Sequence, residues 1–296
     1  MPIKHLAERH CITHPASFRL KDVATDDTAN IESKQEAKKL LARGVEELSA
    51  MQEILYAHDR WSVLLIFQAM DAAGKDSTIK HVMSGVNPQG CQVYSFKSPS
   101  PEELDHDFLW RTTCRLPERG RIGIFNRSYY EEMLVVRVHP EYLDRQKLPS
   151  SCRPAKLETL WKERYESVVD YERHLARNGT LVLKFFLHIS PEEQARRFLD
   201  RLEEPEKNWK FSAADADERL RWKDYMQAYE DMIRHTSTPH GRWYVIPADH
   251  KWYARLAVAA AITKAMRGLD LAYPALDDAQ TATLKKLRER FRREVG

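Results

Sequence analysis

Five short apolar segments divide the chain, and segments of amphipathic pattern fill the intervals between them. The first, Val63 to Phe67, is an unbroken apolar run, which is typical of a strand buried on both faces of a parallel sheet. The five predicted strands lie at residues 63–67, 92–97, 122–125, 180–189 and 243–246. Helical patterns lie near residues 101–114, 128–137, 155–177, 191–201, 213–235 and 251–267. Strands alternating with helices predict an α/β fold of three layers, in which a five-stranded parallel sheet carries helices on both faces.

The two ends of the chain differ from this central pattern. Residues 1–32 are mixed in character and rich in turn formers, which predicts an irregular N-terminal arm. Residues 33–58 carry apolar side chains at three- and four-residue spacing, which predicts an amphipathic helix leading into the first strand. A charged helix near 277–294 is more typical of a surface or a subunit contact than of catalysis. We therefore expect an arm, one domain over 33–270, and a C-terminal helix within 271–296.

A turn of small residues and a lysine follow the first predicted strand. Small side chains let the backbone approach a phosphate closely, and they occupy Ala72, Ala73 and Gly74. Lys75 adds a full positive charge, and a helix-compatible segment begins at Ser77. The N–H groups of such a turn and the dipole of the helix face the same point, where they attract an anion. The segment therefore predicts a phosphate-binding loop.

This loop departs from the strict P-loop pattern at two positions. Ala69 stands where that pattern has glycine, and Asp76 stands where it has a hydroxyl residue; Ser77 and Thr78 come one and two residues late. An ordinary polar turn after a buried strand is the alternative. Asp71 argues against it, because a carboxylate beside a bound phosphate is repelled unless a cation lies between them. We interpret Asp71 as a Mg²⁺ ligand or as the base for an acceptor phosphate.

A second polar cluster follows the strand at 122–125. Ligands of open α/β sheets bind at the carboxyl ends of the strands, so this cluster is expected beside the loop. Arg127 can pair bidentately with phosphate oxygens, and Asn126 could hold metal-bound water or a phosphate. Ser128 could belong to the site or merely cap the next helix.

An arginine-rich segment precedes that strand. It contains Arg111, Arg115, Arg119 and Arg121, with Glu118 as the acid between them. Arg111 and Arg115 are four residues apart and are predicted to share one helix face. The four arginines form either a solvated face or a track for a polyanion that leads into the site.

A third cluster spans residues 191–211, where a predicted helix breaks at Pro205 into a basic and aromatic loop. In nucleotide kinases such a segment is a lid that closes over the reacting phosphates. Its acidic residues leave internal salt bridges as the alternative. The basic residues that the lid would bring to phosphate are Arg197, Arg201, Lys207 and Lys210.

Composition narrows the classes of function. A chain of 296 residues accommodates one large α/β domain or two small ones, and the five predicted strands fit one domain. Its net charge of +3 is too close to neutral to indicate general nucleic-acid binding. The four cysteines are widely spaced, and the sequence shows neither a signal peptide nor a membrane-spanning run, so we expect a cytoplasmic protein without a membrane partner.

With these clusters in place, the chain resembles the polyphosphate kinase 2 family over about residues 35–267. It is most similar to the group that phosphorylates nucleoside mono- and diphosphates from inorganic polyphosphate. The resemblance is carried by six blocks in order, at residues 67–76, 84–90, 105–111, 123–131, 208–212 and 246–252.

The resemblance implies a thymidylate-kinase-like P-loop fold, Mg²⁺ dependence, and reversible transfer of the terminal phosphoryl of polyphosphate to AMP or ADP. It implies an active centre of Asp71, Lys75, Asn126 and Arg127. The pairing of Asn126 with Glu131 indicates the monophosphate-accepting group, since other groups have aspartate at position 126. The family usually has glycine where this chain has Ser77. Relatives commonly form dimers or tetramers, so we expect a homo-oligomer.

The predicted site thus has a catalytic and a phosphate-binding part. The catalytic residues are Asp71, Lys75, Asn126, Arg127 and Glu131, with Asp71 as the Mg²⁺ ligand. The phosphate-binding residues are Ala72, Ala73, Gly74, Asp76, Ser77, Lys80, Arg111, Arg115, Arg121, Arg197, Arg201, Lys207 and Lys210. Two alternatives remain: an ATP-dependent nucleotide kinase on the same fold, and a polyanion-binding protein without catalysis. The carboxylates within the basic site argue against the second, because a purely electrostatic binder has little use for them.

Overall fold

The computed structural model describes residues 3–31, 33–210 and 213–296. Five parallel strands form one sheet in the order β2-β3-β1-β4-β5. The strands are β1 Ser62–Gln68, β2 Cys91–Ser95, β3 Ile122–Asn126, β4 Thr180–His188 and β5 Gly241–Pro247. All five predicted strands are confirmed, as is their parallel arrangement. β1 lies at the centre with every residue buried, which explains its uninterrupted apolar sequence.

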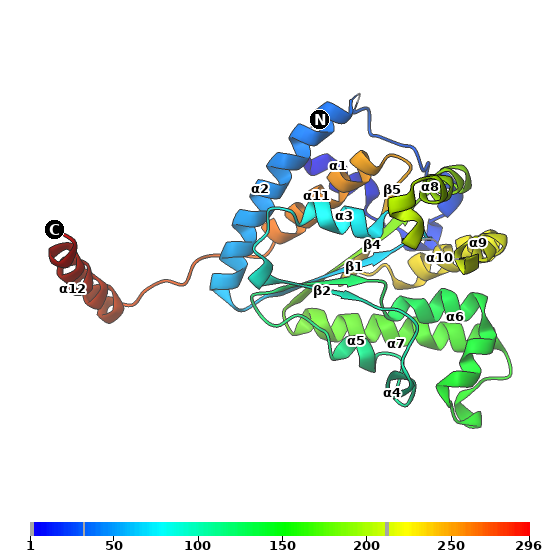
Figure 1. The fold of residues 1–296 in the computed structure, drawn as a ribbon. Helices are drawn as coiled ribbons and strands as arrows, with labels where there is room; N and C mark the ends of the chain where they lie inside the picture. The colour runs from blue at the N-terminus through cyan, green and yellow to red at the C-terminus, as the bar shows by residue number, and fades with distance from the viewer. Residues whose placement is uncertain (1–2, 32, 211–212) are drawn as a thin grey trace.

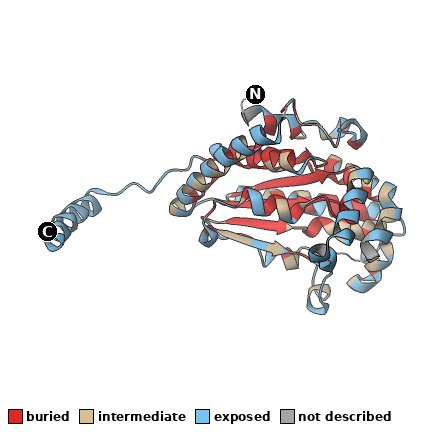
Figure 2. Cartoon of the chain, turned by 45° about the horizontal axis from the view of Figure 1, so that its top comes forward, coloured by how far each residue is buried: buried red, intermediate tan, exposed pale blue. Residues whose placement is uncertain are grey.

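Helices cover both faces of the sheet and complete the three predicted layers (Figure 1). One face carries α1 Ile3–His10, α2 Lys34–His58, α3 Lys75–Val82 and α11 Lys251–Arg267. The other carries α5 Trp110–Thr113, α6 Val135–Val138, α7 Leu157–Arg177 and α10 Trp222–Thr236. α11 is rich in alanine and apolar on nearly all sides because it lies between the sheet and the outer helices. Figure 2 shows the strands and this inner helix as the buried centre of the molecule.

The N-terminal segment does not extend from the body as an arm. Leu6 and Ala7 of α1 are each 1% exposed and pack in the main core. The Ile12 N–H donates to the carbonyl of Trp243 on β5 at 2.9 Å. The segment therefore belongs to the folded domain, because its apolar side chains cover α11 and the edge of the sheet.

Three of the predicted helices are interrupted. The pattern near 213–235 forms α9 Ala213–Glu218, the 3₁₀ helix η8 Arg219–Arg221 and then α10. The pattern near 101–114 forms two one-turn helices, α4 Pro101–Leu104 and α5, separated by Asp107, whose carboxylate accepts from the N–H of Leu109 at 2.9 Å. Arg115 consequently lies beyond α5, so it does not share a helix face with Arg111 as predicted. The pattern near 128–137 forms the 3₁₀ helix η4 Tyr129–Met133, followed by α6.

Three further helices lie at the two ends of the molecule (Figure 1). α8 Pro191–Glu203 and α9 Ala213–Glu218 lie at the end where the strands finish, with the 3₁₀ helix η7 Pro205–Lys210 between them. α12 Asp278–Val295 stands apart at the opposite end, joined by an extended segment. In the part of the chain that the structure describes, no helix combines the length and apolar character needed to cross a bilayer.

Candidate active site

A cleft of about 860 Å³ opens at the carboxyl edge of the sheet. The connections that leave β1 and β3 turn to opposite sides there, which produces a crevice in sheets of this topology. Its walls come from the β1–α3 loop, the ends of β2 and β3, α8 and the start of α11. The lining residues are Asp71, Ala72, Gly74, Lys75, Asp76, Ser77, Ser95, Phe96, Lys97, Ser98, Asn126, Arg127, Arg197, Asp200, Arg201 and Lys251. The structure thus brings most of the predicted loop and its partner cluster to one cavity.

The loop between β1 and α3 uses two left-handed backbone positions. Ala72 has a φ of 62° and Gly74 a φ of 103°. A Cβ atom on Gly74 would lie 3.3 Å from Ser77 Oγ, so glycine suits this position both conformationally and sterically. Ser77 Oγ donates to the carbonyl of Gly74 at 3.0 Å. The Ser77 hydroxyl therefore closes the joint between loop and helix.

Lys75 is the first residue of α3 and is only 9% exposed. Its Nζ donates to the carbonyl of Ala69 at 2.8 Å, which fixes the ammonium group across the loop. Burial lowers the pKa of Lys75, while the carboxylates of Asp71, Glu131 and Asp76 act to raise it. The loop thus presents a preorganised cation surrounded by acids.

Arg127 lies between two of these carboxylates. It follows β3 with a φ of 65°, and its N–H donates to the carbonyl of Phe67 at 3.0 Å. This turn places Nη2 at 2.9 Å from Asp71 Oδ1 and Nη1 at 3.6 Å from Glu131 Oε2. The arrangement Asp71–Arg127–Glu131 therefore joins the loop to the segment after β3.

Glu131 lies at the inner end of this arrangement. Burial raises the pKa of Glu131, although Arg127 and Lys75 oppose the shift. With its amide oriented to satisfy both neighbours, Gln68 donates to Glu131 Oε1 at 2.8 Å and accepts from Ser128 Oγ at 3.1 Å. Ser128 Oγ also accepts from the N–H of Tyr130, so the capping role considered for Ser128 is confirmed.

A buried polar network fixes the segment that carries Glu131. Tyr129 and Tyr130 donate their hydroxyls to Glu172 Oε1 at 2.9 and 2.7 Å. Lys184 of β4 donates to Glu172 Oε2 at 2.6 Å, and neither of these two charged side chains is exposed. Burial lowers the pKa of Lys184, and Glu172 opposes that shift. Sequence reasoning missed this network; its signal was a lysine within an otherwise apolar strand.

Asn126 and Asp76 face each other across the cleft. The Asn126 amide donates to Asp76 Oδ1 at 2.5 Å. This hydrogen bond fixes the two predicted site residues relative to one another. An aspartate at position 126 would instead place its negative charge against that of Asp76.

Arg197 holds the loop from behind. It is 4% exposed, and its guanidinium donates to the carbonyls of Ala72, Ala73, Ala248 and Asp249 at 2.6–3.1 Å. Its Nε donates to Glu193 at 2.8 Å. Burial lowers the pKa of Arg197, which Glu193 opposes. Arg197 thus ties the β1–α3 loop to the turn after β5. It also lines the cleft, and its predicted contact with phosphate stays a prediction.

The predicted arginine track is divided between the two edges of the sheet. Arg111 lies near the cleft, where Nη2 donates to the carbonyl of Lys97 at 2.8 Å. Arg121 precedes β3 and so lies at the amino edge, roughly 16 Å from the carboxyl end of a five-residue strand. Arg115 lies over the ring of Tyr94, with 5.4 Å between the guanidinium carbon and the ring centroid. The segment from 114 to 121 therefore returns the chain from the carboxyl edge to the amino edge, and this separates Arg111 from Arg121 in space.

The remaining predicted residues are distributed as follows. Arg201 lines the cleft from α8, and Lys80 is exposed on α3. The side chains of Lys207 and Lys210 lie outside the described part of the structure. Sequence reasoning missed Lys97 and Lys251, which line the cleft just after β2 and β5. The carboxyl-end rule that selected Arg127 would have found both.

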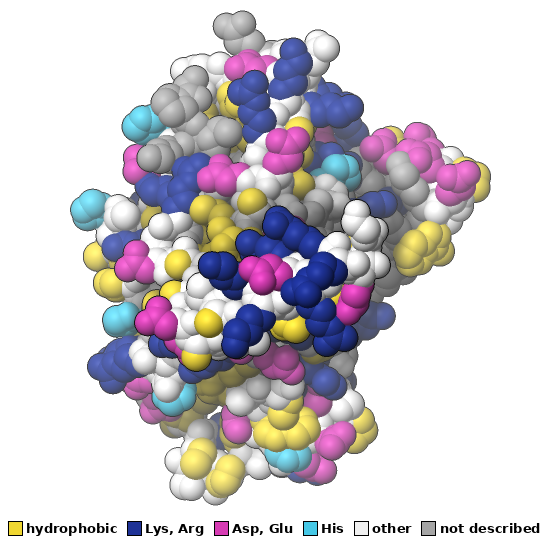
Figure 3. Space-filling view, turned by 90° about the vertical axis from the view of Figure 1, so that its left-hand side faces the viewer, with side chains coloured by type: hydrophobic (Ala, Val, Ile, Leu, Met, Phe, Trp, Pro, Cys, Tyr) yellow, Lys and Arg dark blue, Asp and Glu magenta, His cyan; other side chains and the backbone are white. Residues whose placement is uncertain are grey.

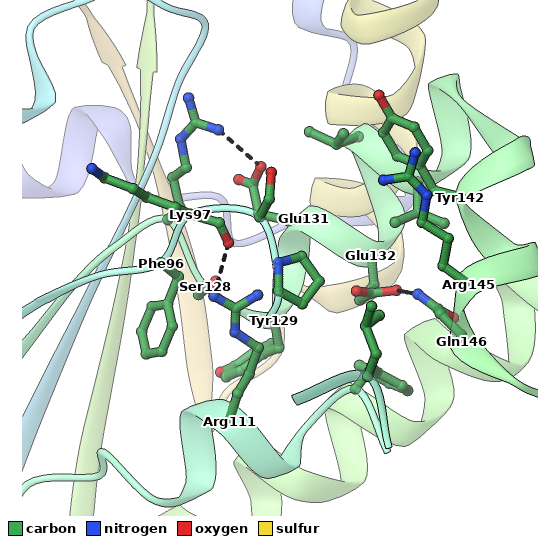
Figure 4. A pocket seen from close by; sticks show the side chains of 17 residues that line it. Phe96, Lys97, Arg111, Ser128, Tyr129, Glu131, Glu132, Tyr142, Arg145 and Gln146 are labelled. Carbon is green, nitrogen blue, oxygen red and sulfur yellow. Dashed lines mark hydrogen bonds and ion pairs between the residues drawn. The ribbon is translucent and has the colours of Figure 1, made fainter. Parts of the chain in front are cut away.

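A second, smaller cavity of about 160 Å³ adjoins the cleft (Figure 4). The two share Phe96, Lys97, Ser98 and Arg127 as lining residues. Apolar side chains alternate there with polar groups that are already paired, such as Glu132, which accepts from Gln146 at 2.6 Å. Its other lining residues are Pro99, Leu104, Phe108, Arg111, Ser128, Tyr129, Glu131, Val135, Val136, Tyr142 and Arg145. An apolar cavity with a few fixed polar groups suits a small organic ligand.

The carboxylates of the cleft suit a metal ion that takes its remaining ligands from a bound phosphate and from water. Among the described residues, no group of three or more His, Cys, Asp or Glu side chains could hold a metal on its own. Mg²⁺ commonly uses one or two carboxylates and completes its shell with phosphate oxygens and water. Asp71, with about a third of its side chain exposed, could supply such a ligand, and Glu131 lies on the other side of Arg127.

The chain is similar to known proteins in both sequence and structure. The sequence profile of the polyphosphate kinase 2 family matches residues 31–272. The chain is 55% identical over 260 residues to the ADP-polyphosphate phosphotransferase of Rhodopseudomonas palustris, covering 88% of this chain and 89% of that protein. It is 44% identical over 258 residues to the AMP/ADP-polyphosphate phosphotransferase of Meiothermus ruber, covering 87% and 91%. The crystal structure of polyphosphate kinase 2 from Arthrobacter aurescens is similar with a TM-score of 0.86 and 37% identity, over 96% of each chain.

Proposed function

The chain belongs to the polyphosphate kinase 2 family, and we propose that it transfers the terminal phosphoryl group of inorganic polyphosphate to AMP and ADP, reversibly and with Mg²⁺. The observation that carries this proposal is the pair of adjoining cavities that share Arg127. The large cleft holds the phosphate loop, and the small cavity offers apolar walls for a base. Donor and acceptor would therefore meet at Arg127.

The donor side suits a chain of phosphates better than ATP. Beyond the loop, the walls of the large cleft carry the cationic side chains of Arg201 and Lys251, with Asp200 as an acid beside them. An adenine ring needs apolar surface, which lines the small cavity instead. This distribution favours polyphosphate over ATP as donor.

The transfer needs no separate base. The second pKa of a phosphate monoester is near 6, so the acceptor's terminal phosphate is largely a dianion at neutral pH. One of its oxygens attacks the terminal phosphorus of polyphosphate, the bond from that phosphorus to the bridging oxygen breaks, and the electron pair stays on the shortened chain. Lys75, the loop N–H groups and Arg127 stabilise the charge on the transferring group. Mg²⁺ held by Asp71, with Glu131 nearby, would reduce repulsion between the two anionic substrates.

Incubation with Mg²⁺, long-chain polyphosphate and AMP freed of ADP tests this proposal. We expect ADP first and ATP afterwards, measured by chromatography. ATP formed from ADP alone, with no product from AMP, would restrict the enzyme to diphosphates. No product from either acceptor would overturn the proposal.

Asp71→Asn tests the metal assignment. The amide keeps the shape and can still accept from Arg127 but lacks the charge that a hard cation prefers. We expect a higher Mg²⁺ concentration for half-maximal rate. An unchanged Mg²⁺ titration at normal rate would remove Asp71 from the metal site.

We also propose that the chain forms a homo-oligomer, either a dimer or a tetramer. Light scattering coupled to size-exclusion chromatography measures the mass of the assembly directly.

A further inference from the structure

Cations gather at the end of the molecule opposite the active-site cleft (Figure 3). On the body they surround the amino ends of β1, β3 and β4, and they come from Arg60, Arg119, Arg121 and Arg177. On α12 they are Lys285, Lys286, Arg288, Arg290, Arg292 and Arg293. We call these two groups together the amino-edge surface.

Backbone contacts bring the body arginines together. Arg119 Nη1 donates to the carbonyl of Arg60 at 2.7 Å. The Ser62 N–H donates to the carbonyl of Gly179, two residues after Arg177, at 3.0 Å. Two acids lie among them: Glu118 is 3.7 Å from Arg121, and Asp59 lies beside Gly120, so that two carboxylates face four arginines. The net charge of the body part of the surface is therefore positive.

The path of the chain brings α12 to the same end. α11 begins at the cleft and runs back for 17 residues, a distance of about 25 Å at the helical rise of 1.5 Å per residue. The connection to α12 leaves from that far end, as Figure 1 shows. No residue of α12, all of which the structure describes, is buried.

The charge of α12 exceeds what its own acids can pair. Six cations occupy residues 285–293, whereas Glu289 and Glu294 are the acids over the same part of the helix. Its exposed apolar positions are Leu284, Leu287, Phe291 and Val295. This stripe covers less than two heptads and is flanked by Arg288 and Arg290, which would repel their counterparts in a symmetric helix pair. The cationic face is therefore the more specific feature of the helix.

We propose that the amino-edge surface binds polyphosphate, as a second site remote from the cleft. This inference rests on the proposed function. β1 has seven residues, so the two edges of the sheet are roughly 23 Å apart. A hexaphosphate spans only about 18 Å at roughly 3 Å per unit on ordinary bond lengths, whereas a chain of many tens of units reaches both sites. A long donor is then held at two points, which raises its effective concentration at the cleft.

Two matched variants of α12 test the proposal in the full chain. The charge variant combines Lys285→Gln, Lys286→Gln, Arg288→Gln and Arg292→Gln and keeps the apolar stripe. The apolar variant combines Leu284→Gln, Leu287→Gln and Phe291→Gln and keeps every cation. Their KM and kcat are measured with polyphosphate of roughly one hundred units and with hexaphosphate. A third variant, Arg60→Gln with Arg177→Gln, tests the body part of the surface.

We expect the charge variant to raise KM for the long chain about tenfold, as lost avidity predicts, and to leave kcat and all hexaphosphate kinetics unchanged. Its long-chain KM should also depend less on salt, because fewer counterions are released on binding. The apolar variant should behave as the unaltered protein, and the body variant should shift in the same direction as the charge variant.

Three outcomes would overturn the inference. Equal effects on long and short donors would place the cations at the cleft. Loss of the oligomer in the apolar variant, with an unchanged long-chain KM in the charge variant, would make α12 a contact with a second copy of the chain. Duplex DNA or anionic vesicles that bind α12 while long polyphosphate does not compete would assign it to another anion. Failure of the unaltered protein on both donors would instead refute the proposed function.

Discussion

Lys75 is the cation at the end of the β1–α3 loop, and its hydrogen bond to the Ala69 carbonyl fixes its position in the cleft. We expect Lys75→Ala to lower kcat about 10²- to 10³-fold, because a preorganised contact to the transferring group is lost. The circular dichroism spectrum should not change. Lys162→Ala, at a side chain that is 73% exposed on α7 and outside the predicted site, is the control and should keep its activity. A fully active Lys75→Ala variant would exclude the loop from catalysis.

Glu131 should govern the acidic limb of the pH profile. Burial raises its pKa above the ordinary value of 4.5, so the carboxylate is protonated at a higher pH than an exposed glutamate. If catalysis requires the ionised form, kcat falls as the pH decreases through that raised pKa. Glu131→Gln should lower kcat and remove this limb from the profile, measured over a range where the unaltered protein stays folded. A limb that persists in the glutamine variant belongs to another group.

At the level of elements, one buried side chain connects the loop to its surroundings. Arg197 joins the β1–α3 loop and α8, which line the cleft, to the turn after β5. We expect Arg197→Lys to cost at least about 2 kcal/mol of unfolding free energy, because several buried carbonyls lose their donor and an ammonium group cannot replace the planar guanidinium. Urea unfolding measures the loss.

Arg196→Lys is the control for this change. The neighbouring Arg196 is 71% exposed and pairs only with Glu193 in the contacts described, so its replacement should stay within about 0.5 kcal/mol. If the two variants unfold alike, the loop does not depend on Arg197.

For the whole molecule, the two terminal segments should contribute unequally to stability. Deletion of residues 272–296 removes only exposed side chains and a linker, so the unfolding free energy should change by no more than about 0.5 kcal/mol. Deletion of residues 1–31 uncovers α11 and removes the buried side chains of Leu6 and Leu20, each worth about 1.5–3 kcal/mol. Thermal unfolding of the two truncated chains compares them. Equal melting temperatures would contradict the packing of the N-terminal segment.

The sequence alone predicted the sheet and the position of its cleft. The run from Val63 to Phe67 requires burial on both faces, and polar residues directly after such strands mark the carboxyl edge. These inferences succeed because they depend on neighbours in sequence, which remain neighbours in space. The phosphate loop, the cluster at Asn126 and Arg127, and the five parallel strands were all of this local kind.

The tertiary structure decided which charges meet. Arg111 and Arg121 are ten residues apart, yet a strand leads away from one of them and places them near opposite edges of the sheet. Arg197 faces backbone carbonyls of the loop, and Lys184 meets Glu172 in the core, because elements distant in sequence pack there. The N-terminal segment is buried for the same reason. The local sequence predicts whether a side chain is polar and where the strand that carries it ends. The group that this side chain contacts depends on the packing of distant elements, which no short stretch of sequence encodes.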